Sequence, residues 1–178
     1  MNYKLRSKLK SRELGSKGFT LMELIVVISI IGVLAALLLV NFQSARERAR
    51  DAARKSDLRQ IKSALRLYYN DAQEYPLDNG SGQINTCGAG NNSPCVWGVD
   101  EFSFSNIVYM GYLPADPVNT PPYEYAYTRL GQDEFTLETY LENASDEDPA
   151  RSQLRCDPNV TSLTDADIVP RRYLTCQD

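Results

Sequence analysis

The chain has 178 residues, of which 19 are Lys or Arg, 23 are Asp or Glu, four are Cys and none is His. This length suits one domain of ordinary size with an appendage, and a hydrophobic share of 43% argues against a wholly disordered chain. The absence of histidine excludes Ser-His-Asp triads, Cys-His dyads and histidine-ligated metal sites. No catalytic residue is assigned, and we do not expect an enzyme.

The net charge of −4 is unevenly distributed along the chain. Residues 1–18 carry a net +5, and residues 19–43 carry −1. Residues 44–66 hold eight basic and three acidic side chains, a net +5, whereas residues 67–178 hold five basic and eighteen acidic ones, a net −13. A basic head, an apolar segment, a basic segment and an acidic body therefore follow one another.

The apolar segment contains an uncharged run over residues 24–40, LIVVISIIGVLAALLLV. As a helix this run is about 25 Å long, just short of a hydrocarbon core of ~30 Å, and counting from Phe19 brings it to a spanning length. A buried helix of a soluble protein is the alternative, but the run is apolar on every face. No small-x-small cleavage site follows it, so we expect a retained transmembrane helix over residues 19–43.

Glu23 is the one charged residue of this segment. A carboxylate beside a membrane span is costly and is a functional candidate for that reason. The simpler interpretation is an acidic residue at a helix start, where the helix dipole favours negative charge. Composition alone leaves both interpretations open.

The residues around Glu23 form a specific string. Lys17 and Gly18 are followed by Phe19, then by Glu23 four residues further on, then by the apolar run. This string, KGFTLMELIVVISIIGVLAALLL, resembles the class III signal of type IV pilins and type II secretion pseudopilins. The resemblance implies that a membrane prepilin peptidase removes the basic leader, residues 1–18, between Gly18 and Phe19, and that Phe19 is N-methylated. It also implies that Glu23 pairs with the N-terminal amine of a neighbouring subunit and so sets the register of assembly.

The same resemblance implies an α+β fold of the pilin type, in which one long N-terminal helix packs on a small antiparallel β-sheet with disulfide loops. The implied partners are identical subunits in a homopolymer, a membrane platform protein, a cytoplasmic assembly ATPase and, before assembly, membrane lipid. The N-terminus would be cytoplasmic and the C-terminal domain extracytoplasmic, and the subunit would then enter an extracellular or periplasmic filament. Many pilins carry proline near the end of the apolar run, but residues 39–42 have none. We therefore expect a less interrupted helix, with Gly32 as its weak point.

The helix should continue as an amphipathic, soluble half over residues 44–75, since proline at position 76 cannot extend it. Its apolar positions recur at spacings of three and four, with one irregular step between Ala52 and Leu58. Glu47–Arg50 and Asp51–Lys55 are expected to form surface ion pairs. The apolar positions are Ala45, Ala49, Ala52, Leu58, Ile61, Leu65 and Tyr68.

Eight basic side chains lie between these apolar positions, from Arg46 to Arg66. They could contact nucleic acid, but the acidic body would repel phosphate, and no aromatic residues are interleaved with them. We therefore expect a solvated face that meets acidic neighbours, and no nucleic-acid partner.

Residues 76–178 should form a globular β-sheet domain with turn-rich loops. Its four cysteines allow three pairings, of which we favour Cys87–Cys95 and Cys156–Cys176 because each closes a local loop. Zinc is the rival explanation, but the sequence has no CxxC spacing and no His. Disulfides imply an oxidising, extracytoplasmic compartment.

Two alternating segments, residues 123–128 and 135–141, predict a β-hairpin whose apolar face packs on the helix. The segment Gly111-Tyr112-Leu113-Pro114 resembles the segment before the first strand of major pseudopilins. Outside these segments, acidic residues gather in two groups. Major pseudopilins bind calcium in a C-terminal loop, so calcium is conceivable here, but EF-hand spacing is absent. We favour acidic solvated loops and assign no metal ligands. The acidic residues are Glu142, Asp146, Glu147 and Asp148, then Asp157, Asp165 and Asp167.

The sequence thus predicts a structural prepilin of a type IV pilus or related filament, polymerised through its N-terminal helix. One alternative is the major pseudopilin of a type II secretion pseudopilus. A second alternative is a signal-anchored extracytoplasmic domain that does not polymerise.

Overall fold

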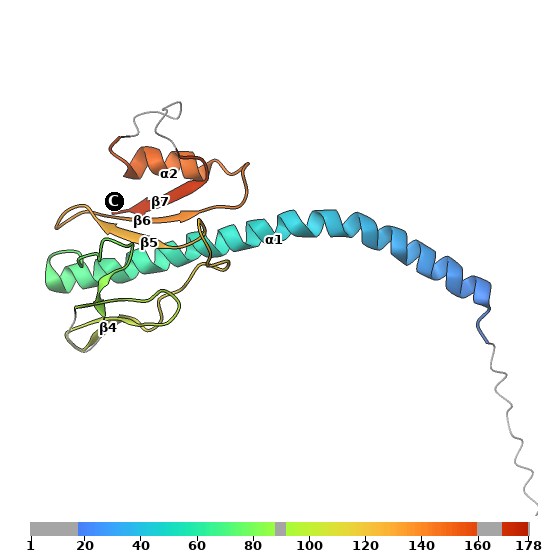
Figure 1. The fold of residues 1–178 in the computed structure, drawn as a ribbon, viewed down its shortest axis with the longest axis horizontal. Helices are drawn as coiled ribbons and strands as arrows, with labels where there is room; N and C mark the ends of the chain where they lie inside the picture. Colours follow the sequence, from blue (N-terminus) through green and yellow to red (C-terminus); the bar gives the residue numbers. More distant parts are fainter. Residues whose placement is uncertain (1–17, 88–91, 160–168, 178) are drawn as a thin grey trace, which may run out of the picture. The chain divides into compact units, whose positions relative to one another are not determined.

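A computed structural model describes residues 18–87, 92–159 and 169–177, with the backbone alone at residues 37–41 (Figure 1). The chain forms two compact units, one ending at Asn41 and the other beginning at Phe42. The expectations for residues 1–17 of the leader, and for Asp165 and Asp167, lie outside the described residues.

The predicted long helix is α1, Leu21–Ala72. It ends where Gln73 adopts a left-handed conformation with φ 57°, while the Gln73 N–H still donates to the carbonyl of Tyr69 at 2.8 Å. A left-handed residue just past the last turn is a common way to end a helix, so the helix stops before the proline predicted to end it. Counting only described residues, no helix is both long enough and apolar enough to cross a membrane.

The second unit is built around a three-stranded antiparallel sheet in the order β5-β6-β7. The sheet lies between α2 and the second half of α1 (Figure 1). β5 and β6 form the predicted hairpin, with Tyr127 opposite Leu137, but β7 and α2 were not predicted. The elements are β5, Ala126–Arg129; β6, Phe135–Tyr140; α2, Asp148–Cys156; and β7, Arg172–Cys176.

Four short strands form two further antiparallel pairs between α1 and β5, in a segment for which no strand had been predicted. The hydroxyl of Tyr109, in the second of these pairs, donates to Asp71 of α1 at 2.9 Å. On the sheet side, the hydroxyl of Tyr125 donates to Asp57 of α1 at 2.8 Å. Polar contacts therefore tie α1 to both groups of strands. The four strands are β1, Asn85–Cys87; β2, Ser93–Pro94; β3, Phe102–Phe104; and β4, Ile107–Met110.

The core lies where the predicted apolar face of the helix meets the strands. Leu58, Ile61, Leu65 and Tyr68 of α1 are buried in one cluster with Tyr127, Phe135 and Leu137 of the sheet. Burial of such side chains contributes ~1.5–3 kcal/mol each. The hairpin therefore packs as its alternating pattern predicted.

The predicted apolar face is wrong for the first part of the soluble half of α1. Ala45, Ala49 and Ala52 are exposed, and the buried residues in this part of α1 are Asp51 and Arg54. The alanines are small and bury little area, whereas Asp51 and Arg54 each find partners in the loops that reach this side of the helix. Polar contacts therefore decide which side of this part of the helix faces the body.

Two disulfides join Cys87 to Cys95 and Cys156 to Cys176, the two local pairings that the spacing favoured. The first links β1 to the residue after β2, and the second links the end of α2 to the end of β7. The second disulfide thus fastens α2 to the strand on which it packs.

Candidate functional site

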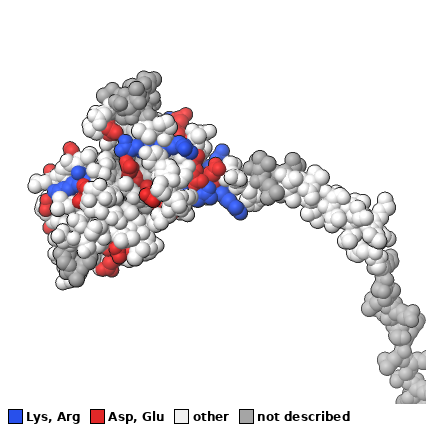
Figure 2. Space-filling model, in the orientation of Figure 1, with Lys and Arg blue, Asp and Glu red and all other residues white. Residues whose placement is uncertain are grey.

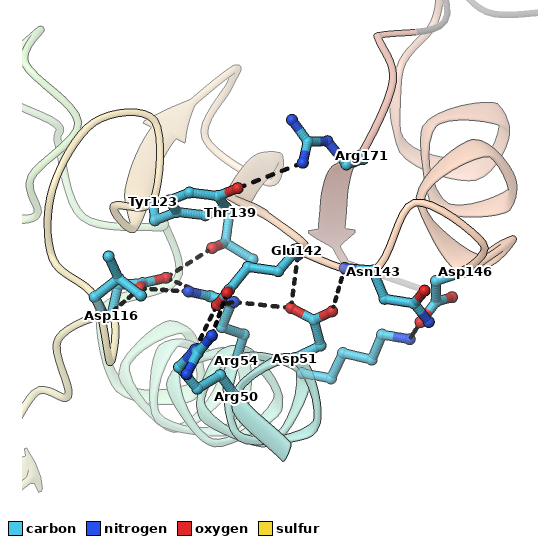
Figure 3. A network of polar contacts seen from close by, with 12 residues as sticks. Arg50, Asp51, Arg54, Asp116, Tyr123, Thr139, Glu142, Asn143, Asp146 and Arg171 are labelled. Carbon is cyan, nitrogen blue, oxygen red and sulfur yellow. Dashed lines mark hydrogen bonds and ion pairs between the residues drawn. The ribbon is translucent and has the colours of Figure 1, made fainter. Parts of the chain in front are cut away.

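Arg54 is the largest fully buried side chain among the described residues, and it has no exposed surface. Its Nε and Nη2 donate to the two oxygens of Asp116 at 2.6 and 2.9 Å, and its Nη1 donates to Asp51 at 2.8 Å and to Glu142 at 2.7 Å (Figure 3). Paired contacts of this kind between a guanidinium and a carboxylate are strong and directional. Three carboxylates thus compensate one buried cation.

The same contacts hold the loop after β6 against the helix. Arg50 donates from Nε to Glu142 at 2.6 Å and also from Nη2 to the same carboxylate. Asp51 accepts the backbone N–H groups of Glu142 and Asn143, each at 2.9 Å. One turn of α1 therefore fixes both the side chain and the backbone of this loop (Figure 3).

Asp116 extends the network to the loop that precedes β5. One of its oxygens accepts the backbone N–H of Val118 at 2.8 Å, and the other accepts the Thr139 hydroxyl at 3.3 Å. The ring of Tyr123 lies 5.0 Å from the guanidinium carbon of Arg54, within range of a cation–π contact. The loop before β5, strand β6 and the helix thus meet at one buried charge.

The network shifts the ionisation of its members. Burial alone would lower the pKa of Arg54, but its hydrogen bonds to Asp116, Glu142 and Asp51 outweigh that effect and raise the pKa. Burial likewise favours a raised pKa for Asp116, yet Arg54 and nearby backbone N–H groups lower it. The hydrogen bond from Arg50 is the main cause that lowers the pKa of Glu142 to about 2. All these groups therefore remain charged near neutral pH.

Lys55 binds two of the acidic residues that follow β6. Its Nζ lies 2.6 Å from a carboxylate oxygen of Asp146 and 2.6 Å from one of Asp148. The expected Asp51–Lys55 pair is therefore wrong, and so is the interpretation of these acids as simply solvated. Among the described residues, no group of three or more Asp, Glu, His or Cys side chains could hold a metal ion.

Arg50 also departs from the sequence prediction. It was expected to pair with Glu47, but it hydrogen-bonds Glu142 from the loop after β6. A partner on the same helix surface gains only ~0.2–0.5 kcal/mol, so a half-buried partner from the body can displace it. Asp157 of the second acidic group similarly lies 3.3 Å from Arg172 rather than standing free.

In the first unit, the predicted site residue Glu23 caps its own helix. One carboxylate oxygen, Oε2, accepts the backbone N–H of Thr20 at 2.9 Å and the Thr20 hydroxyl at 2.8 Å. The Thr20 Oγ1 in turn accepts the N–H of Glu23 at 3.2 Å. This reciprocal arrangement is a capping box, which satisfies two backbone donors at a helix start.

The helix that follows this cap is apolar and uncovered. Every described side chain from residue 18 to residue 36 is exposed, and Phe19 is 86% exposed. A single subunit offers nothing to cover this surface among its described residues, and water is an unfavourable neighbour for it. An apolar environment, whether lipid or other helices, is needed around this part of α1.

The same N-terminal residues match a known family profile, the prokaryotic N-terminal methylation motif, over residues 15–39. The type II secretion system core protein G of Pseudomonas aeruginosa is 35% identical over 109 residues, which are 61% of this chain and 71% of the relative. The chain belongs to the family of type IV pilins and type II secretion pseudopilins.

Two further members of this pilin family illustrate its range. The type II secretion system core protein G of Aeromonas hydrophila is 30% identical over 132 residues, 74% of this chain and 88% of the relative. The type IV wide pilus major component PilA4 of Thermus thermophilus is 41% identical over 70 residues, 37% of this chain and 45% of the relative. No solved structure gives a significant match.

Sequence reasoning placed Gly18, Phe19 and Glu23 of this pilin-family chain in one motif but missed Thr20 and Arg54. The spacing Thr20-x-x-Glu23 is itself a capping-box pattern and could have been recognised. The signal for Arg54 was the irregular step between Ala52 and Leu58, because the buried arginine occupies that gap in the apolar pattern.

We predict that Arg54→Ala lowers the free energy of unfolding by about 3–5 kcal/mol, because it leaves Asp116 buried without its counter-charge. Arg59→Ala, at an exposed position on the same helix, should change it by less than about 0.5 kcal/mol. Urea unfolding of the purified full chain in detergent, followed by circular dichroism, measures both. Equal effects of the two substitutions would contradict a structural role for the network.

We also predict that the unfolding free energy falls with acidification. Because the pKa of Glu142 is about 2 when folded, against an ordinary 4.5, its contribution is complete above about pH 4.5 and disappears as the pH falls through 2. The loss from this group is on the order of 2 kcal/mol. Between pH 6 and about pH 2, the unfolding free energy of Glu142→Gln should depend less steeply on pH than that of the wild type. Glu101→Gln, at an exposed control position, should keep the wild-type slope, and a Glu142→Gln slope equal to it would refute the assignment.

Proposed function

We propose that this protein is a structural subunit of a type IV pilus or a related filament, polymerised through the apolar part of α1. The observation that carries the proposal is the motif in which Gly18, Phe19 and Glu23 precede an uncovered apolar helix, within the segment that matches the family profile. The proposed role is structural, and it assigns the chain no catalysis of its own.

Processing and location form part of the proposal. A prepilin peptidase would cut between Gly18 and Phe19, and Phe19 would then be N-methylated. Before assembly, residues 19–43 would lie in the membrane with the N-terminus in the cytoplasm and the second unit outside. A membrane platform protein and a cytoplasmic ATPase would then drive insertion into the filament. The two disulfides support an oxidising location for the second unit.

The geometry of Glu23 suits pairing between subunits. Among the described contacts, the capping box uses only Oε2 of this carboxylate, which leaves Oε1 available. Cleavage after Gly18 creates an amine on Phe19, and a neighbouring subunit could bring that amine to Oε1. In an apolar surrounding an unpaired charge is costly, so only a correctly staggered neighbour would neutralise both groups.

A type II secretion pseudopilus is the second candidate. It is supported by the two matches that cover 71% and 88% of their relatives, since both relatives are type II secretion system core proteins. The match to the pilus component PilA4 covers 45% of that protein. Both candidates use the same N-terminal motif and the same kind of assembly.

Processing can be tested by the intact mass of the protein purified from its native membrane. We predict a chain that begins at Phe19 and carries one added methyl group. Gly18→Val should retain residues 1–18, because the small residue before the cut is lost, whereas Gly32→Val within the helix should be processed normally. A wild-type chain that still begins at Met1 would contradict the proposal.

Polymerisation can be tested with Glu23→Gln, which keeps an acceptor for the cap of α1 but removes the charge. Loss of a charge-assisted contact of about 1.5–3 kcal/mol at each subunit should reduce filament yield by about tenfold or more. Electron microscopy of sheared filaments measures the yield, and membrane fractionation should show unchanged insertion. Glu47→Gln, on the same helix outside the motif, is the control. Wild-type filament yield from Glu23→Gln would refute the pairing of Glu23 between subunits, and absence of filaments from the wild type would instead favour an anchored domain that does not polymerise.

A further inference from the structure

Arg46 and Arg48 differ from the basic residues that follow them on α1. Arg50, Arg54 and Lys55 each hold at least one carboxylate of the second unit. Arg46 and Arg48 are both exposed, and neither has an ion pair with any described residue. Figure 2 shows basic side chains gathered around α1 at the start of the second unit. The acidic body therefore leaves these two charges for a partner outside the subunit.

Their place in the sequence indicates the chemistry of that partner. They follow Val40, the last residue of the apolar run, by six and eight residues of one helix, which is less than three turns. Helix side chains lean toward the N-terminus, and a long arginine can extend further in that direction. If the run occupies the hydrocarbon core, the headgroup layer is about 5–7 Å thick beyond it. Both guanidinium groups can reach that layer.

The angular positions of the two residues favour a layer over a single macromolecule. Residues two apart on an α-helix project about 200° from each other, so Arg46 and Arg48 point to opposite sides of α1. A neighbouring subunit or a nucleic-acid duplex that approaches from one side can contact only one of them. A headgroup layer surrounds the helix and can contact both. Phe42, which is 58% exposed, lies just before them, where aromatic residues often mark a membrane interface.

We propose that Arg46 and Arg48 bind the phosphates of anionic phospholipid headgroups in the leaflet where α1 leaves the membrane. This inference rests on the membrane-inserted state in the proposed function. The contact holds the unassembled subunit at a fixed depth, and it must be released when the subunit enters the filament.

The full chain, reconstituted in nanodiscs of phosphatidylglycerol and phosphatidylcholine, provides the test. Native mass spectrometry after transfer to detergent counts the phosphatidylglycerol molecules that each subunit retains. Arg46→Gln with Arg48→Gln should reduce this retention on the order of tenfold, because the double variant loses the attraction of both arginines to the anionic lipid. Arg59→Gln with Arg155→Gln removes the same charge at two other exposed positions and should leave retention unchanged. Phosphatidylcholine retention should not respond to either pair.

Four other results would overturn the inference. Equal loss of phosphatidylglycerol in both double variants would show that net charge alone attracts the lipid. Binding of a short DNA duplex by the wild type in detergent, lost only in Arg46→Gln with Arg48→Gln, would assign the arginines to nucleic acid. Release of the wild type from vesicles by alkaline carbonate would remove the membrane step of the proposed function as well. Wild-type protein that resists carbonate but shows no preference for phosphatidylglycerol would refute this inference alone.

Discussion

A guanidinium group cannot be buried without compensation, and this constraint organises the second unit. Arg54 has no exposed surface, so its charge must be met inside the protein. The carboxylates that meet it come from its own helix, from the loop before β5 and from the loop after β6. Each of these loops can therefore occupy only the position in which it reaches the arginine. Arg50 and Lys55 of the same helix add ion pairs to Glu142 and Asp146 in the segment after β6.

The polar network and the apolar core divide the attachment of α1 between them. Leu58, Ile61 and Leu65 supply buried area against the hairpin, and burial of this kind is strong but not directional. The contacts of Arg54 are directional, and they specify the rotation of the helix and the paths of two loops. This division explains why small alanines on the opposite side could not determine which face of the helix was buried.

The first unit poses the opposite problem, because its apolar side chains have no partner within the described chain. Glu23 satisfies the backbone at the start of this helix through Thr20 and keeps one oxygen available. A carboxylate that first caps its own helix and then accepts a neighbour's amine would avoid being unpaired in either state. The cap thus gives a physical reason for a threonine three residues before the glutamate, in addition to the role implied for Glu23 by the family.

The sequence alone determined the features that depend on residues close together in the chain. The prepilin motif, the long helix, the β5–β6 hairpin and the preference for the two local disulfide pairings all follow from short spacings, because period, turn chemistry and loop closure act locally. Only the tertiary structure decided the burial of Arg54, the partners of Lys55 and the addition of β7 to the sheet. Arg54 and Asp116 are 62 residues apart, and Lys55 and Asp148 are 93 apart. No local pattern connects residues at such separations, since a buried ion pair is favourable only after the surrounding elements have excluded water and brought the charges within hydrogen-bond distance.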